Sequence, residues 1–285
     1  MALSSNQYGT SRIRLLRVER HGDRHDLKDL TAQVEVEGDF AAAHIEGDNR
    51  NVTATDTIVN TVYALARGGT GELEEFGQRL VSHFLRNNPA IHHVRATLRE
   101  PLWARIPVGG KPAGSSFLRE SSGLRVATVR GKRADDSAGA DYEATIHAGI
   151  EDLPVLKTSH SAYENFRDDV YTTLQDKSDV VLATAINATW LYSHTGVAFS
   201  TVWHGVRHLI LEIFAQHESK SLQHTLYSMG ETILGSFDDM LEIHLSMPLK
   251  HLQLVDLERF NLRNENEIFA AAEEPAALIE ATIRR

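Results

Sequence analysis

The sequence predicts an α+β fold in which antiparallel sheets are covered on one face by paired helices. Three observations predict it: apolar residues that alternate with period two, two pairs of amphipathic helices, and an element order that occurs twice. That order is strand–strand–helix–helix–strand–strand. The repeat lies in element order rather than in residue identity, and it predicts two similar halves, residues 8–138 and 139–285.

The first half opens with two paired strands and continues with two helices and further strands. In the second strand the apolar residues that alternate are Leu30, Ala32, Val34 and Val36. A helix is expected from about Thr53 to Gly68-Gly69, which ends it. The full series of predicted ranges is strands 11–20 and 29–38, helices 53–68 and 71–86, a strand near 94–98, and strands 116–120 and 123–131.

The second half repeats this order. Its alternating strands include one that reads Val180, Leu182, Thr184, Ile186, Ala188 and Trp190. The predicted ranges are strands 142–150 and 180–190, helices 199–217 and 220–235, and strands 239–246, 250–257 and 277–284. Neither half contains a strand followed by a glycine-rich loop and a helix, so a dinucleotide-binding unit is excluded.

Composition excludes several classes of function. The chain of 285 residues has no cysteine, which excludes a disulfide scaffold, a thiolate metal site and a cysteine nucleophile. A formal charge of 29 − 39 = −10 argues against nucleic-acid binding, because phosphate contacts require cations. No stretch approaches the roughly 20 apolar residues of a membrane span. A cytoplasmic protein without a membrane or nucleic-acid partner is therefore expected.

The 15 histidines raise the question of a metal. His204 and His208 share a helix face, but no glutamate lies between them in the metalloprotease pattern. His92 and His93 are neighbours on a predicted strand and point to opposite faces. We therefore expect no metal site, and most of these histidines are expected to be solvated.

Three further positions have both a structural and a functional interpretation. Thr53 as N-cap and Asp56 in the first turn would satisfy a helix start, yet the same amides and the Thr55 hydroxyl could hold an anionic or polar ligand. His251 is either a surface histidine or a group that passes a proton near neutral pH. Gln223 is either an exposed helix residue or an amide that reads a heterocycle edge.

At these positions the chain resembles the urate oxidase family. The matching blocks run in order from about residue 7 to the end and include Tyr8-Gly9, Ala54-Thr55-Asp56-Thr57, Leu156-Lys157, Tyr171-Thr172-Thr173-Leu174, Gln223 with Tyr227-Ser228-Met229, Lys250-His251 and Leu278-Ile279-Glu280-Ala281-Thr282-Ile283. The resemblance implies two tandem tunnelling-fold (T-fold) halves and a homotetramer whose sheets close into a barrel-like tunnel. It also implies active sites at subunit interfaces, with dioxygen as co-substrate and no metal or flavin cofactor.

The resemblance also assigns roles residue by residue. Thr55, followed by Asp56, matches the family threonine, and His251 matches the histidine that handles protons. Tyr163 stands where a stacking phenylalanine is usual, and Gln223, preceded by Leu222, matches the glutamine that grips the ring edge. Three positions depart from the family pattern, since a lysine, an arginine and an asparagine are replaced by Thr10, Val180 and Leu249.

All three departures remove polarity or charge. Without the arginine, an anion facing Val180 loses a bidentate, charge-assisted grip. We therefore expect a cofactor-independent oxidase that acts with O2 on urate or, in preference, on a less anionic, urate-like electron-rich heterocycle. The alternatives are a non-catalytic homologue that serves as a ligand-binding or structural tetramer, and a weak uricase that uses a different base, such as Lys250 or Arg12.

Overall fold

The computed structural model describes residues 3–134, 142–250, 252–271 and 277–285. The chain forms two compact units. The first comprises Met1–Gly149 and Leu191–Ser200, and the second comprises Ile150–Trp190 and Thr201–Arg285. Strand β5 begins in the first unit and continues in the second. Within the described residues, no helix is long and apolar enough to cross a membrane.

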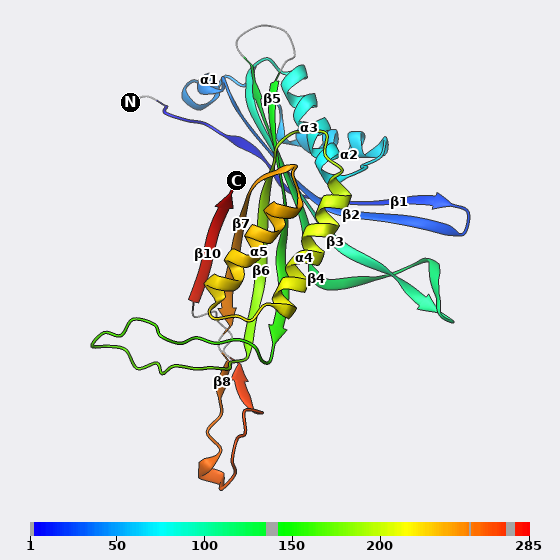
Figure 1. The fold of residues 1–285 in the computed structure, drawn as a ribbon. Helices are drawn as coiled ribbons and strands as arrows, with labels where there is room; N and C mark the ends of the chain where they lie inside the picture. The colour runs from blue at the N-terminus through cyan, green and yellow to red at the C-terminus, as the bar shows by residue number, and fades with distance from the viewer. Residues whose placement is uncertain (1–2, 135–141, 251, 272–276) are drawn as a thin grey trace. The chain divides into compact units, whose positions relative to one another are not determined.

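The first unit is an antiparallel sheet with helices on one face (Figure 1). Its strands lie in the order β1-β2-β3-β4-β5. The elements are β1 (Tyr8–His21), β2 (Arg24–Gly38), α1 (Ala41–Ile45), α2 (Thr55–Arg67), α3 (Leu73–Asn87), β3 (Ile91–Val108), β4 (Lys111–Arg133) and β5 (Tyr142–Lys157).

Alternation along β2 determines which face of this sheet is buried. Ala32, Val34 and Val36 are fully buried, as the period-two pattern predicts, and they pair with β1 and β3. The β1–β2 pairing shifts register between Thr10 and Ile13. This shift separates the start of β1 from its regular part.

Helix α3 packs on β3 and β4, and α2 lies beside α3 and against β1. A capping box forms at the start of α3, where Glu72 is the N-cap and the Glu75 side chain reaches back to the Glu72 amide. Close packing requires a glycine in the helix, because a Cβ at Gly77 would lie 2.6 Å from the Val129 side chain on β4. The capping box thus fixes where α3 begins, and Gly77 marks the face of α3 that packs on β4.

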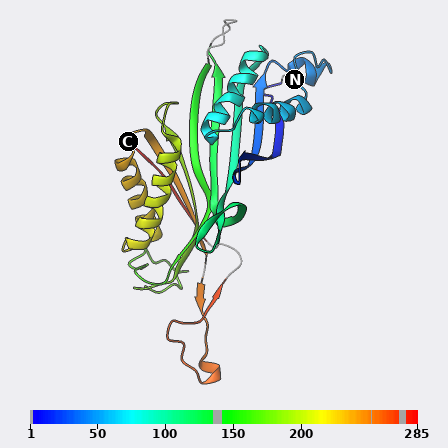
Figure 2. The ribbon, with the colours of Figure 1, turned by 90° about the vertical axis from the view of Figure 1, so that its right-hand side faces the viewer.

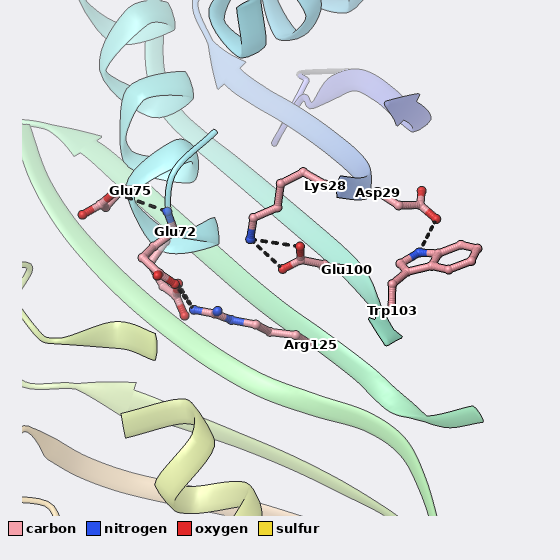
Figure 3. Close-up of polar contacts among 8 residues, drawn as sticks. Lys28, Asp29, Glu72, Glu75, Glu100, Trp103 and Arg125 are labelled. Atoms are coloured by element: carbon pink, nitrogen blue, oxygen red, sulfur yellow. Dashed lines mark hydrogen bonds and ion pairs between the residues drawn. The ribbon is translucent and has the colours of Figure 1, made fainter. Parts of the chain in front are cut away.

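A buried ion cluster joins the start of α3 to β4. The Arg125 guanidinium contacts the carboxylates of Glu72 and Glu74, each at 2.8 Å (Figure 3). The Glu74 side chain is 0% exposed, and burial raises the pKa of its carboxyl despite the attraction of Arg125. Because each buried charge relies on the other, this cluster fixes where α3 begins relative to the sheet.

The second unit contains the rest of β5, β6 (Leu182–Tyr192) up to Trp190, and α4 (Phe199–Gln216) from Thr201, with strands in the order β5-β6-β7-β10. Helices α4 and α5 (Leu222–Ser236) are followed by β7 (Met240–Lys250) and β10 (Ala277–Arg284). Between β7 and β10 in the sequence, β8 (Leu252–Leu254) and β9 (Phe269–Ala271) pair as a separate two-stranded ribbon (Figure 1). The short helix η1 (Glu258–Phe260) lies in the connection between them.

Helix α5 packs on β7 and β10, and Figure 2 shows it beside α4. The contact with β10 is close, since a Cβ at Gly230 would lie 2.6 Å from Ile283. Strand β10 pairs with β7 over its whole length without a register shift, from Ala277 opposite Leu249 to Arg284 opposite Glu242. It is the last strand of this order, so only one of its edges is paired within the described chain.

The predicted α+β class, the strands and the two helix pairs are confirmed, but some bounds are not. The loop expected over 21–28 is a tight turn at Gly22, whose positive φ of 64° glycine adopts without strain, so β1 and β2 extend to His21 and Arg24. The strand expected over 250–257 is wrong beyond Leu254, because the chain there leaves the β8–β9 ribbon for η1. The division at 138/139 stays a prediction.

Candidate active site

The residues that the sequence assigns to the site fall into one group in each unit. The first unit holds Thr10, Thr55 and Asp56. The second unit holds Tyr163, Val180, Leu222, Gln223 and Leu249. His251, the expected proton-handling histidine, lies outside the described residues.

In the first unit, Thr10 lies beside the start of α2. The register shift that follows Thr10 has the form of a β-bulge, with Arg12 in the left-handed region at φ 57°. Bulges re-aim side chains and are frequent beside functional sites. Here the Thr10 hydroxyl donates to the backbone carbonyl of Thr55 at 3.4 Å. The two predicted positions are therefore brought into contact, and the Thr55 side chain remains exposed.

The start of α2 is fixed by contacts outside the helix. The Thr53 amide donates to the Tyr8 hydroxyl at 2.8 Å, and the Thr53 hydroxyl accepts from the Asn88 side chain at 3.0 Å. Burial raises the pKa of Tyr8, so its hydroxyl stays protonated. The prediction that Thr53 caps the helix is wrong, because its hydroxyl bonds to Asn88 and Ala54 is the N-cap.

As a result, no side chain caps the first turn of α2. Asp56 lies in that turn, exposed, and accepts a hydrogen bond from Asn60 one turn later at 2.9 Å. Backbone amides at a helix start attract anionic or polar groups when no side chain satisfies them. Thr55 is thus an exposed residue at a helix start that no side chain caps.

In the second unit, backbone hydrogen bonds gather three segments. Tyr163 and Lys177 exchange both backbone bonds, at 2.8 and 3.0 Å, and the Val180 amide donates to the Ser161 carbonyl at 2.8 Å. On the other side, the Ala162 amide donates to the Ser219 carbonyl at 2.7 Å. Tyr163, the predicted platform, and Val180, the predicted arginine position, therefore lie on neighbouring segments of the chain.

Tyr163 carries an aromatic partner that the sequence analysis did not identify. Its ring stacks on that of Phe166, with centroids 5.1 Å apart and planes inclined by 12°. Tyr163 is 39% exposed, so the ring is supported from one side while part of it stays open. A ring held in this way can stack on a planar ligand. The only sequence feature that could have predicted this stacking is the spacing of the two aromatic residues, which lie three positions apart.

Helix α5 presents Gln223 and buries Leu222. The Ser221 hydroxyl caps the helix by accepting from the His224 amide at 3.1 Å, so the following residues begin a regular turn. Leu222 is 7% exposed and packs into the core of the unit. Gln223 is exposed, and an amide side chain carries both a donor and an acceptor.

Lys157, His217 and His224 form a lysine–histidine cluster beside the start of α5. The Lys157 ammonium donates to the His217 carbonyl at 2.8 Å, and the His217 ring lies 4.4 Å from the His224 ring. Burial lowers the pKa of Lys157. It also lowers the pKa of His217, with further repulsion from His224 and Lys157. The His217 ring contacts the buried Thr225 hydroxyl at 3.1 Å, which ties α4 to α5.

Leu249 lies near the end of β7, half-buried and opposite Ala277. Next to it, a cavity of about 340 Å³ is lined mostly by apolar side chains: Pro154, Val155, Leu156, Ala183, Thr184, Lys250, Leu252 and Ala271. Lys250 is the charged residue in this lining. The leucine thus adds no polar group at the place where an asparagine would offer an amide.

The histidines that the structure describes do not gather around a metal position. Among the described residues, no group of three or more histidine or carboxylate side chains could hold a metal ion. His208 instead pairs with Glu212 one turn along α4, at 3.4 Å. The shared face of His204 and His208 therefore carries a surface contact between a histidine and a glutamate.

Two units with antiparallel sheets, each covered by paired helices, define a protein of the tunnelling-fold class. A model of the uricase family matches residues 6–130 and 146–280. The uricase of Arthrobacter globiformis is 41% identical over 285 residues, which cover all of this chain and 90% of that protein. The uricase of Dictyostelium discoideum is 36% identical, with 99% of this chain and 97% of that protein covered. The chain belongs to the uricase family.

Solved structures agree with this membership. The crystal structure of the Arthrobacter globiformis uricase superimposes with a TM-score of 0.93 at 40% identity, covering all of this chain and 95% of that one. The fold class and the family expected from the sequence are therefore confirmed.

Proposed function

We propose that this protein is a cofactor-independent oxidase that uses O2 to oxidise a urate-like, electron-rich heterocycle, with a less anionic ring preferred over urate. Membership of the uricase family over the full length of the chain supports the reaction class. The preference rests on one observation. Val180, which the family resemblance aligns with the arginine that grips an anion, is hydrogen-bonded to the segment that carries Tyr163.

In the proposed reaction the substrate ring loses two electrons and a proton. Dioxygen takes up two electrons and two protons to become hydrogen peroxide. Water adds its hydroxyl to the oxidised ring carbon and releases the second proton. With urate these products are 5-hydroxyisourate and hydrogen peroxide. The ring itself supplies the electrons, so the protein has to orient it and move protons.

Each site residue has a proposed role. The ring stacks on the open part of Tyr163, and the Gln223 amide pairs with a donor and an acceptor on its edge. Thr55 contacts the ring from the opposite side and, with His251, moves protons. Because the Thr10 hydroxyl already bonds the Thr55 backbone, no ammonium adjoins Thr55 at that place. Leu249 leaves the dioxygen or water position without an amide partner. Loss of one such electrostatic group lowers rates by about 10²–10³-fold.

We propose a homotetramer in which Thr55 of one chain meets Tyr163 of a neighbour. Exposed Thr55 at a helix start and exposed apolar side chains on the long hairpins, Leu16, Val108 and Leu118, support this assembly. The two tandem T-fold halves would then close their sheets with those of other chains. The cytoplasmic location stays a prediction.

The test is oxygen consumption by the purified protein without added metal or flavin. Urate, other oxidised purines and pteridines would be offered singly, and peroxide would be measured alongside oxygen. We expect consumption with at least one ring and weak turnover of urate. Urate oxidation at ordinary uricase rates would refute the preference for a less anionic ring. No consumption with any ring, by an intact assembly, would refute the oxidase and favour a non-catalytic binder.

A further inference from the structure

We propose that Lys177 supplies the cation for the substrate edge that Val180 no longer provides. The inference rests on the proposed function and specifies what the pocket recognises. Lys177 would hold one oxygen of the ring, next to the edge that Gln223 reads. This contact would make Lys177 a specificity-determining residue. Comparison with the family pattern reveals only the lost positive charge.

The first support is the pairing of Lys177 with the platform. Tyr163 and Lys177 exchange both of their backbone hydrogen bonds, at 2.8 and 3.0 Å, and form an antiparallel bridge. In such a pair the Cα atoms lie about 5.5 Å apart and both side chains leave the same face. A ligand stacked on Tyr163 would therefore lie within reach of the flexible four-carbon stem of the lysine.

The second support is the register of the two paired segments. Tyr163 lies two residues from Ser161, whereas their partners Lys177 and Val180 lie three residues apart. One extra residue on one strand is the arrangement of a β-bulge. Val180 and Lys177 therefore lie on one short segment, which is hydrogen-bonded to Ser161 and Tyr163. The lysine thus lies near the position that the family resemblance assigns to the arginine.

The third support is that the charge of Lys177 is available. The side chain is exposed and makes no hydrogen bond or ion pair with any residue that the structure describes. Its neighbour Asp176 accepts the Asn165 amide at 3.0 Å, so that carboxylate is already engaged. An ammonium is a single point charge, unlike the planar fork of a guanidinium. One partly charged oxygen on the ring therefore suits this site better than a bidentate anion.

The experiment measures urate binding without oxygen and turnover with oxygen in Lys177→Gln and Lys177→Arg. Lys111→Gln is the matched control, since Lys111 is an exposed lysine on β4 that makes no ion pair with described residues. We expect Lys177→Gln to raise Kd for urate and KM for the best substrate about tenfold, with kcat changed less than threefold. The arginine variant should keep wild-type affinity, and adding Val180→Arg to Lys177→Gln should recover the loss.

Equal Kd values for wild type and Lys177→Gln would overturn the inference, even if the protein oxidises a heterocycle. No binding of urate by wild type at millimolar concentration would also overturn it. Oxygen consumption decides the proposed function separately. If wild type binds urate and consumes no oxygen with any ring, the oxidase proposal fails while the Kd ratio still decides the role of Lys177. A purely structural role would change the melting temperature and would not be rescued by Val180→Arg.

Discussion

The rings of Tyr163 and Phe166 stack almost parallel, with centroids 5.1 Å apart. This pair gives the candidate site a platform whose orientation is set by a second ring rather than by the ligand. It also determines which part of Tyr163 remains open, since Phe166 covers the other side.

Replacing Phe166 with alanine should weaken substrate binding without unfolding the protein. An aromatic pair contributes about 0.5–1.5 kcal/mol beyond its buried area, so KM should rise roughly two- to tenfold. Phe260→Ala is the control, because Phe260 is an exposed phenylalanine on η1. Steady-state kinetics on both variants would decide, and an unchanged KM in Phe166→Ala would show that Tyr163 holds its orientation alone.

Restoring the three departures should raise urate oxidation. Hydrogen bonds to charged groups contribute about 1.5–3 kcal/mol, so Val180→Arg alone should improve kcat/KM for urate roughly tenfold or more. Adding Thr10→Lys and Leu249→Asn should increase it further. The rate is followed as loss of urate absorbance. If the triple variant assembles normally and gains nothing, the pocket differs from the family in more than these positions.

Breaking the buried ion cluster should destabilise the first unit. Arg125→Met leaves the fully buried Glu74 without its cation, and such a change typically costs about 3–5 kcal/mol at pH 7. Urea unfolding would measure the loss. In this variant the folded-state pKa of Glu74 rises further above its unfolded value, so the native state binds the extra proton and the loss should shrink towards pH 5. A loss that grows towards pH 5 would contradict this account.

The lysine–histidine cluster should make the protein less stable in mild acid. Burial and the neighbouring charges of His224 and Lys157 lower the folded-state pKa of His217. The charge of Glu218 raises the pKa of Lys157, against the effect of burial. The unfolded state therefore takes up a proton first, and stability falls as the pH drops below about 6.5. His217→Gln should reduce the difference in melting temperature between pH 7 and pH 5. His44→Gln, at an exposed histidine on α1, should leave it unchanged.

Periodic patterns predicted most of the fold, because strands and helices bury one face at a fixed spacing. The strand with Val34 and Val36 and the helix with Gly77 are found where the alternation and the helical spacing place them. Thr53 was misassigned because a threonine before a helix is as good a partner for a distant amide, here that of Asn88, as it is a cap.

The site was predictable only in part. Family motifs pointed to Thr55 and Gln223, which lie in matching blocks, and to Tyr163, which stands between blocks where phenylalanine is usual. Phe166 and Lys177 contact Tyr163 within the segment 161–180, which is irregular and follows no period. The contact of Thr10 with Thr55 joins residues 45 positions apart. Such contacts depend on a bulge and a loop register that a single sequence does not reveal.

The regular pairing of β10 with β7 has a practical consequence for handling the protein. β10 carries no bulge, and Leu278 on it is 63% exposed, so its outer backbone is a ready template for another strand. In the proposed tetramer, a condition that separates the chains would leave this edge open before the units themselves unfold. Dilution and mild heating should therefore produce insoluble material through strand addition at intact β10 edges, and a lysine or proline there would be the first change to make in a preparation meant for storage.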